Sequence, residues 1–214
     1  MNSKFSIPLG DTKQLNVFYT LCQTFYWVGF LFLVNYQGNF LLEHGFSNTE
    51  VGFVFALTGI LTVIFQYLLS YITDRYAEKP ISFIVMILLI FNAVIILGIY
   101  LFESSHIMLF ILFVLLGAIY ASISPLINSI NVRFVNEGYA LNFSQARGLA
   151  SFFYAGITFF FSFFITRVGV RRMPALGLIT LALSFIMMLV MRQLELQIPP
   201  RVVDDQDTEE SAGA

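Results

Sequence analysis

Six apolar stretches, each long enough to cross a membrane, constrain the fold of this chain more than any other feature of its sequence. They run at about residues 15–42, 50–72, 80–102, 107–132, 141–166 and 174–194. Ser47 and Glu50 form a capping-box pattern at the start of the second stretch, and Pro80 suits the first position of the third helix. Gly169 and Pro174 bracket the turn before the sixth stretch. The sequence therefore predicts an all-α membrane protein with six transmembrane helices.

Composition supports the membrane assignment and excludes other classes. Of the 214 residues, 58% are hydrophobic and 11% are charged, whereas charged residues make up about a quarter of a soluble domain. A net charge of −2 argues against nucleic acid as a partner, and the single Cys22 rules out an internal disulfide. The first apolar stretch is too long for the core of a secretory signal, so we interpret it as a retained helix. The lipid bilayer is the first expected partner.

The chain divides into two regions. Residues 1–194 form the six-helix bundle, and residues 195–214 are an acidic tail that we expect to be disordered, either as a cytoplasmic tail or as a linker. Placing the amino terminus in the cytoplasm puts seven Lys and Arg residues in the inner loops and three, Arg167, Arg171 and Arg172, in the outer loops. This imbalance favours cytoplasmic termini. The outer arginine cluster opposes it, and its simplest interpretation is a solvated turn.

Arg147 is the one charge that no shift of a helix boundary moves into a loop. A helix that begins near Leu141 carries it about 9 Å into a hydrocarbon core about 30 Å thick. A cation there costs at least about 2.5 to 3.5 kcal/mol, so it normally faces a bundle interior or a wet cavity. Tyr154, seven residues later, returns to within about 20° of the same helix face, with Ser151 between them. The alternative is that Arg147 snorkels to the membrane surface.

Two helices carry polar interruptions. The first has Gln23, Asn35, Gln37 and Asn39, and the fourth has Ser122, Ser124, Pro125 and Asn128. Unsatisfied amides are expensive in hydrocarbon, so these groups should face protein or water. Interrupted helices at corresponding places in two inverted repeats indicate a binding site at the membrane midplane. The alternative is helix packing, in which amides and small residues join neighbouring helices.

Small residues predict close helix contacts. Gly117, Ala121 and Pro125 recur every four residues on the fourth helix, and Ser144 and Gly148 do so on the fifth. Such patterns let helix backbones approach. We expect the stripe on the fourth helix to touch another helix, which would bring Asn128 near the face that bears Arg147.

The residues around Arg147 resemble a known family. Phe143-x-x-Ala146-Arg147, with Tyr154 seven residues after the arginine, is similar to the fifth helix of lactose permease-like oligosaccharide:proton symporters of the major facilitator superfamily. The resemblance implies that Arg147 binds sugar hydroxyls and that Tyr154 stacks on the sugar ring, with Ser151, Asn128, Gln23 and Asn35 as further candidates for solute binding. It also implies two inverted three-helix repeats that form half of a twelve-helix fold, in a bacterial plasma membrane. The expected partner is a carboxy-terminal six-helix half or a second copy.

The loop after the second helix carries another likeness. Asp74, Arg75 and Lys79 match the superfamily signature G-x-x-x-D-[RK]-x-G-[RK]-[RK], in which this chain has Ser70, Ala77 and Glu78 at other positions. In the family this loop forms a charge network that latches the inner gate. The alternative is an ordinary positively charged cytoplasmic loop, since exposed ion pairs contribute little.

The likeness departs from the family pattern on the fourth helix. There a proline is followed three residues later by a glutamate that pairs with the helix-five arginine, and Pro125-Leu-Ile-Asn128 supplies an amide at that place. Asn128 donates and accepts hydrogen bonds but does not neutralise Arg147. Either another acceptor exists, or the ligand is itself an anion or strongly polar.

The sequence contains no pattern typical of an enzyme or of a cofactor site. No acidic residue lies clearly within a span, so a proton-coupling group would belong to the other half of the transporter. We therefore predict a secondary transporter for a sugar or similar small polar solute, seen as its amino-terminal half and without cofactor or metal. The alternatives are a nucleoside, drug or other polar-solute transporter, a membrane interaction protein that does not transport, and a channel-like oligomer.

Overall fold

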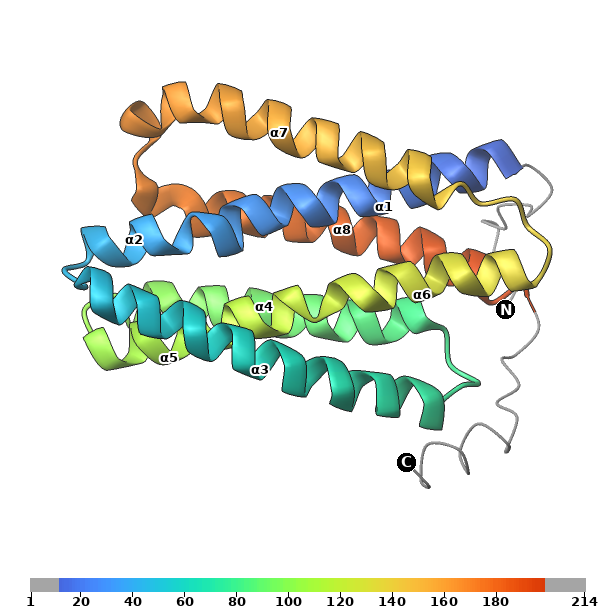
Figure 1. Ribbon diagram of the computed structural model, residues 1–214, viewed down its shortest axis with the longest axis horizontal. Helices are drawn as coiled ribbons and strands as arrows, with labels where there is room; N and C mark the ends of the chain where they lie inside the picture. Colours follow the sequence, from blue (N-terminus) through green and yellow to red (C-terminus); the bar gives the residue numbers. More distant parts are fainter. Residues whose placement is uncertain (1–11, 199–214) are drawn as a thin grey trace.

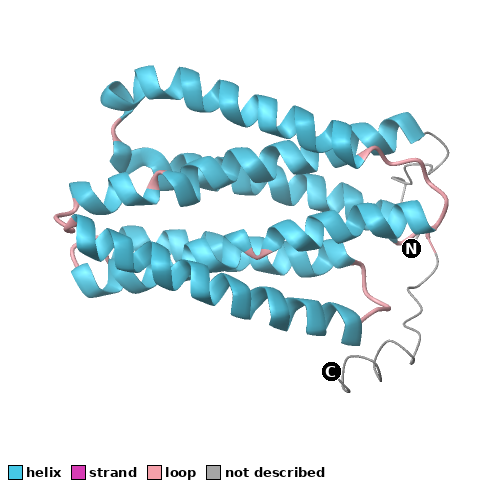
Figure 2. Ribbon diagram, viewed as in Figure 1, coloured by secondary structure: helices cyan, strands magenta, loops and turns pink. Residues whose placement is uncertain are grey.

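The computed structural model describes residues 12–198, except for the side chains of residues 166 and 168. Within this range the chain forms six membrane-length helical segments joined by short turns (Figure 2), which confirms the six predicted spans. The first segment comprises α1 (Thr12–Phe30), a π-helical turn η1 (Leu31–Asn35) and α2 (Gln37–Glu43). The others are α3 (Asn48–Arg75), α4 (Ile81–Leu101), α5 (His106–Ala121) with α6 (Ile123–Asn136), α7 (Phe143–Val168), and η2 (Val170–Arg172) with α8 (Met173–Glu195).

Side-chain caps fix several helix starts. The capping box at α3 is confirmed, because Glu50 N donates to Ser47 Oγ and Ser47 N donates to the Glu50 carboxylate. Asn142 Oδ1 accepts a hydrogen bond from Gln145 N at the start of α7. Pro80, expected at the first helical position of α4, is instead the extended residue before it. A proline lacks the side-chain acceptor that such a position usually offers, so the start of α4 needs another partner.

The helices form a bundle of two layers, and we call the face that carries α7, α1, α6 and α3 the open face (Figure 1). In Figure 1, α7 and α3 lie along opposite edges, α1 and α6 lie between them, and α4 and α8 lie behind. Helix α1 packs on α7 and α8, and α5 packs on α3 and α4. The first turn of α1 and the last turn of α8 lie at the same end of the bundle (Figure 1), as an even number of spans requires. The relation of the two three-helix units as inverted repeats stays a prediction.

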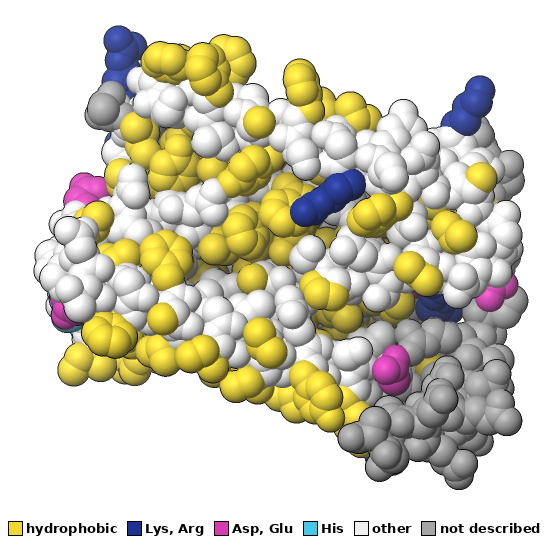
Figure 3. All heavy atoms as spheres, in the orientation of Figure 1, with side chains coloured by type: hydrophobic (Ala, Val, Ile, Leu, Met, Phe, Trp, Pro, Cys, Tyr) yellow, Lys and Arg dark blue, Asp and Glu magenta, His cyan; other side chains and the backbone are white. Residues whose placement is uncertain are grey.

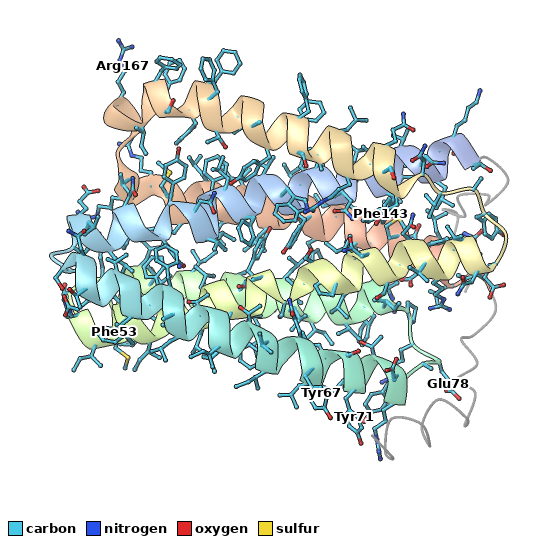
Figure 4. The ribbon with its side chains drawn as sticks, in the orientation of Figure 1. Phe53, Tyr67, Tyr71, Glu78, Phe143 and Arg167 are labelled. Atoms are coloured by element: carbon cyan, nitrogen blue, oxygen red, sulfur yellow. The ribbon has the colours of Figure 1, made fainter. Side chains whose placement is uncertain are left out.

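Burial differs sharply between helices. In an apolar 18-residue stretch of each span, over half of the residues are buried in the first span, 11% in α3 and 6% in α7. Figure 4 shows that Phe53, Tyr67 and Tyr71 of α3 point away from the bundle. Each of these three side chains is more than half exposed. The two edge helices therefore present apolar side chains to lipid or to another membrane segment.

The two predicted small-residue contacts have different outcomes: Gly117 packs against neighbouring helices, and Gly148 does not. A Cβ at Gly117 would lie 2.8 Å from Thr58 Cγ2 and 3.3 Å from Gln37 Oε1, so this glycine lets α5 approach α3 and α2. Ala121 is half-buried, and Pro125 is exposed. For Gly148 the packing prediction was wrong, since it is exposed and a Cβ there would meet nothing within 4 Å.

The tail begins later than expected. Helix α8 ends at Glu195, which is buried, and Ile198 packs in the core of the bundle. Glu195 is thus part of the helical body and not of the acidic tail, because it has buried partners described below. The tail from residue 199 onward lies outside the described residues.

Candidate solute-binding site

Arg147 lies against Trp27. Its guanidinium carbon is 3.8 Å from the centroid of the Trp27 ring. Trp27 is halfway along the first span, Thr12–Glu43, so this cation sits near the middle of the bundle instead of at its end. A cation over an indole gains about 0.5 to 2 kcal/mol, which offsets part of the cost of membrane burial. The side chain packs on the protein and does not extend toward the membrane surface.

Tyr154 contacts the same tryptophan. The two rings meet edge to face with centroids 6.4 Å apart, and Asn35 Nδ2 donates a hydrogen bond to the Tyr154 hydroxyl. Because Arg147 and Tyr154 both touch Trp27, their predicted placement on one face of α7 is confirmed. Asn35 belongs to the π-helical turn, which widens the helix and redirects its side chain.

A second polar pair lies one turn away along α1. Gln23 is buried, and its Nε2 donates to Tyr19 Oη at 2.8 Å and to Asn128 Oδ1 at 3.0 Å. Gln23 and Trp27 are four residues apart and therefore neighbours on the α1 surface. Asn128 and Arg147 thus contact adjacent turns of one helix, as the sequence predicted.

The remaining candidates lie outside this cluster. Ser151 is exposed on α7, on the side of Arg147. Gln37 is buried beside Gly117, and both of its side-chain atoms lack hydrogen-bond partners among the described residues. Gln37 therefore belongs to the packing contact of α2, α3 and α5, whereas Gln23 and Asn35 belong to the cluster at Trp27.

Sequence reasoning missed Trp27, which links the site. It is the only tryptophan in the chain, and it stands one helical turn after Gln23. That spacing was the available signal, because a polar residue and an aromatic residue four apart share one helix face.

The site lies on the open face of the bundle. Figure 3 shows a basic side chain midway along this face, among hydrophobic side chains and away from both ends. A small cavity of about 70 Å³ lies beside the break in the fourth segment, lined on one side by Asp74 and Ser70 and on the other by Pro125. Arg147 is not among its lining residues. The cluster at Trp27 therefore forms one wall of a site and does not enclose a ligand.

The basic residues of the loop motif, Arg75 and Lys79, contact two different tyrosines. Arg75 donates to the Tyr71 hydroxyl at 3.4 Å, and Lys79 Nζ lies 5.0 Å from the centroid of the Tyr76 ring. Asp74 faces the cavity beside Pro125. All three residues lie at the end of the bundle where α3 turns into α4. Their role as a latch stays a prediction.

The opposite end carries an ion-pair cluster. Glu103, in the turn between α4 and α5, accepts hydrogen bonds from Arg171 at 2.7 Å and from His44 Nε2 at 2.8 Å. The Arg171 hydrogen bond is the main reason that the pKa of Glu103 lies below its usual value. The Arg171 member of the outer cluster is therefore paired, and it ties η2 to the ends of α2 and α4. Arg167 points away from the bundle (Figure 4).

Glu195 is a buried carboxylate that the sequence did not reveal. Its side chain accepts hydrogen bonds from the backbone N–H groups of Ile81 at 3.2 Å and Ser82 at 2.9 Å, and it lies 3.5 Å from Arg133 Nη1. It thus caps α4 from a distant part of the chain, which supplies the acceptor that Pro80 lacks. Among the described residues, no group of three or more His, Cys, Asp and Glu side chains is placed to hold a metal ion.

These features define a polytopic α-helical membrane protein with a polar cluster at mid-membrane on an open face. The family model of the Major Facilitator Superfamily matches residues 16–147, which is more than half of the chain. The chain therefore belongs to the Major Facilitator Superfamily and is a major facilitator transporter in general terms, a class whose members are generally not enzymes. A search of curated proteins and a search of solved structures each find no match. The likeness to lactose permease stays a prediction.

Proposed function

We propose that this chain is one six-helix bundle of a proton-coupled secondary transporter for a sugar or a similar small polar solute. The observation that carries the proposal is the stacking of Arg147 on Trp27 halfway along the first span. An ionisable group at this depth is costly and is typical of solute pathways. Tyr154 and the Gln23–Asn128 pair place further polar groups within one or two helical turns of it.

The open face calls for a second bundle. Alternating access requires two bundles that rock around a shared site, and here the cluster at Trp27 forms one wall. We propose that a carboxy-terminal six-helix half, or a second copy of this chain, covers the face between α3 and α7. Among the described residues, no carboxylate or histidine forms an ion pair or hydrogen bond with Arg147 or Tyr154, so the proton-coupling group belongs to that second bundle.

Uptake into proteoliposomes tests the proposal. Vesicles would carry the chain either alone or together with a second bundle, and counterflow of labelled neutral and acidic monosaccharides and disaccharides would be measured. Arg147→Gln should lower counterflow about tenfold or more, because an interaction with charge typically contributes at least about 1.4 kcal/mol. Arg167→Gln is the matched control, since Arg167 points away from the bundle.

Two results would contradict the proposal. Counterflow that is equal in wild type and Arg147→Gln would remove the arginine from the solute path. Loss of function in Gly117→Ala, with Arg147→Gln and Tyr154→Phe unaffected, would instead support an interaction protein that uses its packing faces.

A further inference from the structure

We propose that the solute bound at Arg147 carries an oxyanion, such as a carboxylate, and is not a neutral sugar. The inference rests on the proposed function and names the class of solute for the same site. Two features of the cluster support it: the unbalanced charge of Arg147, and an excess of buried donors to which the amide at position 128 contributes.

The charge of Arg147 is not balanced within the described chain. Two other arginines in the bundle have carboxylate partners, Arg133 with Glu195 and Arg171 with Glu103. No ion pair among the described residues includes Arg147, which has only the face of Trp27 beneath it. A bound anion would neutralise Arg147, the one cation at mid-membrane in the described part of the chain, and offset the cost of its desolvation.

The two buried hydrogen-bonding atoms of the cluster that have no partner among the described residues are both donors. Arg147 Nη1 and Trp27 Nε1 are buried without partners among the described residues. The Tyr154 hydroxyl accepts from Asn35, so its own hydrogen is left to donate. A carboxylate offers only acceptors and matches such a set. A neutral sugar hydroxyl also needs an acceptor, and neither of these two buried atoms provides one.

Asn128 adds to the excess of hydrogen-bond donors at the cluster. Its Oδ1 accepts from Gln23 Nε2, and its own amide nitrogen has two hydrogens that it can donate to a ligand. A glutamate at this position would bring a negative charge to the turn of α1 next to Trp27 and would pair with Arg147. With asparagine the site keeps one positive charge and gains further donors.

Trp27 supplies a direct test. It is the single tryptophan of the chain and lies under the guanidinium, so intrinsic fluorescence reports on this site without background. The full chain in phosphatidylcholine vesicles would be titrated with methyl β-D-glucuronide and with methyl β-D-glucoside at equal ionic strength. The two probes differ in a carboxylate against a hydroxymethyl group. The inference predicts an apparent Kd about tenfold or more lower for the glucuronide.

Variants then assign the preference to the residues. Arg147→Gln should remove the preference, Arg147→Lys should keep part of it because the charge remains, and Asn128→Glu should remove it by neutralising Arg147 internally. Arg167→Gln should behave as wild type. Gel filtration of each variant, with protection of the buried Cys22 from alkylation, shows that it is folded.

The outcomes separate this inference from the proposed function. Equal or tighter binding of the glucoside, a preference that survives in Arg147→Gln, or no response to either probe would overturn the oxyanion inference. Arg147-dependent counterflow of neutral sugars in the same preparation would leave the proposed function standing while the inference falls. Glucuronide binding that depends on Arg147, without counterflow even in vesicles that also carry a second bundle, would support the inference and contradict transport.

Discussion

Tyr26 and Tyr120 each donate a hydrogen bond from the hydroxyl to the backbone carbonyl of the other. The distances are 3.2 Å from Tyr26 and 2.8 Å from Tyr120, and the two rings stack with centroids 5.0 Å apart. Tyr120 stands next to the end of α5, where the fourth segment is interrupted. The Tyr26 hydroxyl therefore gives a hydrogen-bond partner to a backbone carbonyl next to the break. Gly29 makes the contact possible, because a Cβ there would overlap the Tyr120 hydroxyl.

Gly29→Ala should therefore destabilise the bundle by about 1 to 3 kcal/mol through overpacking. The effect should be smaller in a Tyr120→Phe background, since the atom nearest to the new methyl group is then absent. Thermal unfolding followed by alkylation of the buried Cys22 measures both changes. Gly59→Ala is the control, because a Cβ at Gly59 meets nothing within 4 Å. Equal costs in the two backgrounds would contradict the assigned contact.

Gly117 and Gly148 should respond differently to the same substitution. Gly117→Ala should lower the unfolding temperature, because its methyl group would press on Thr58 Cγ2, and Thr58→Ser should restore part of the loss. Gly148→Ala should be neutral or slightly stabilising, since alanine favours the helix over glycine. The Cys22 alkylation assay applies again. A larger fall in unfolding temperature for Gly148→Ala than for Gly117→Ala would contradict the assignment of the packing contact to α5.

The sequence predicts the spans well because apolar length and capping residues are local signals. The start of α3 follows from Ser47 and Glu50, which bond to each other within one turn. Gly117 and Gly148 show the limit of such signals. Both sit in small-residue patterns, yet only the glycine facing Thr58 has a neighbour, because the identity of the neighbouring helix depends on the whole bundle.

Glu195 should contribute to stability as a buried cap. Glu195→Ala removes the acceptor of two backbone N–H groups and a partner of the buried Arg133, so we expect a loss on the order of 3 kcal/mol. Glu195→Gln keeps an acceptor oxygen and should cost less. Glu137→Gln is the control on an exposed glutamate. The free energy of unfolding in denaturant, at constant lipid composition, measures the three variants. A Glu195→Ala variant as stable as Glu137→Gln would refute the cap.

Acid should weaken the cluster at Glu103. Its pKa is lowered mainly by the Arg171 hydrogen bond, and His44 contacts it as well, while Glu43 lines the same cavity of about 320 Å³. A lowered carboxyl pKa adds stability above the usual value of about 4.3, and this is lost as pH falls through the folded-state pKa. Unfolding temperatures between pH 7 and pH 3 should therefore fall more in wild type than in Glu103→Gln. Parallel curves for the two proteins would contradict the pairing.

At the candidate site, the sequence predicted the residues of α7 but not the tryptophan of α1 against which they pack. Arg147 and Tyr154 follow from helical spacing, which is a local property. Their contact with Trp27 depends on the packing of α7 against α1, and the two helices are far apart in the sequence. Glu195 was missed for a similar reason, since its partners Ile81 and Ser82 stand more than one hundred residues away.

The most direct test asks whether water reaches the face of α7 that bears Arg147. In a Cys22→Ser background, single cysteines would replace Ser151, which lies on the side of Arg147, and Phe160, which is 65% exposed and about 220° around the helix from it. Alkylation by a charged, membrane-impermeant thiol reagent would be measured in proteoliposomes that carry the chain together with a second bundle. We expect rapid labelling at position 151 and almost none at position 160, where lipid covers the side chain. Labelling at 160 with protection at 151 would contradict it, because the arginine would then face lipid and not a solute path.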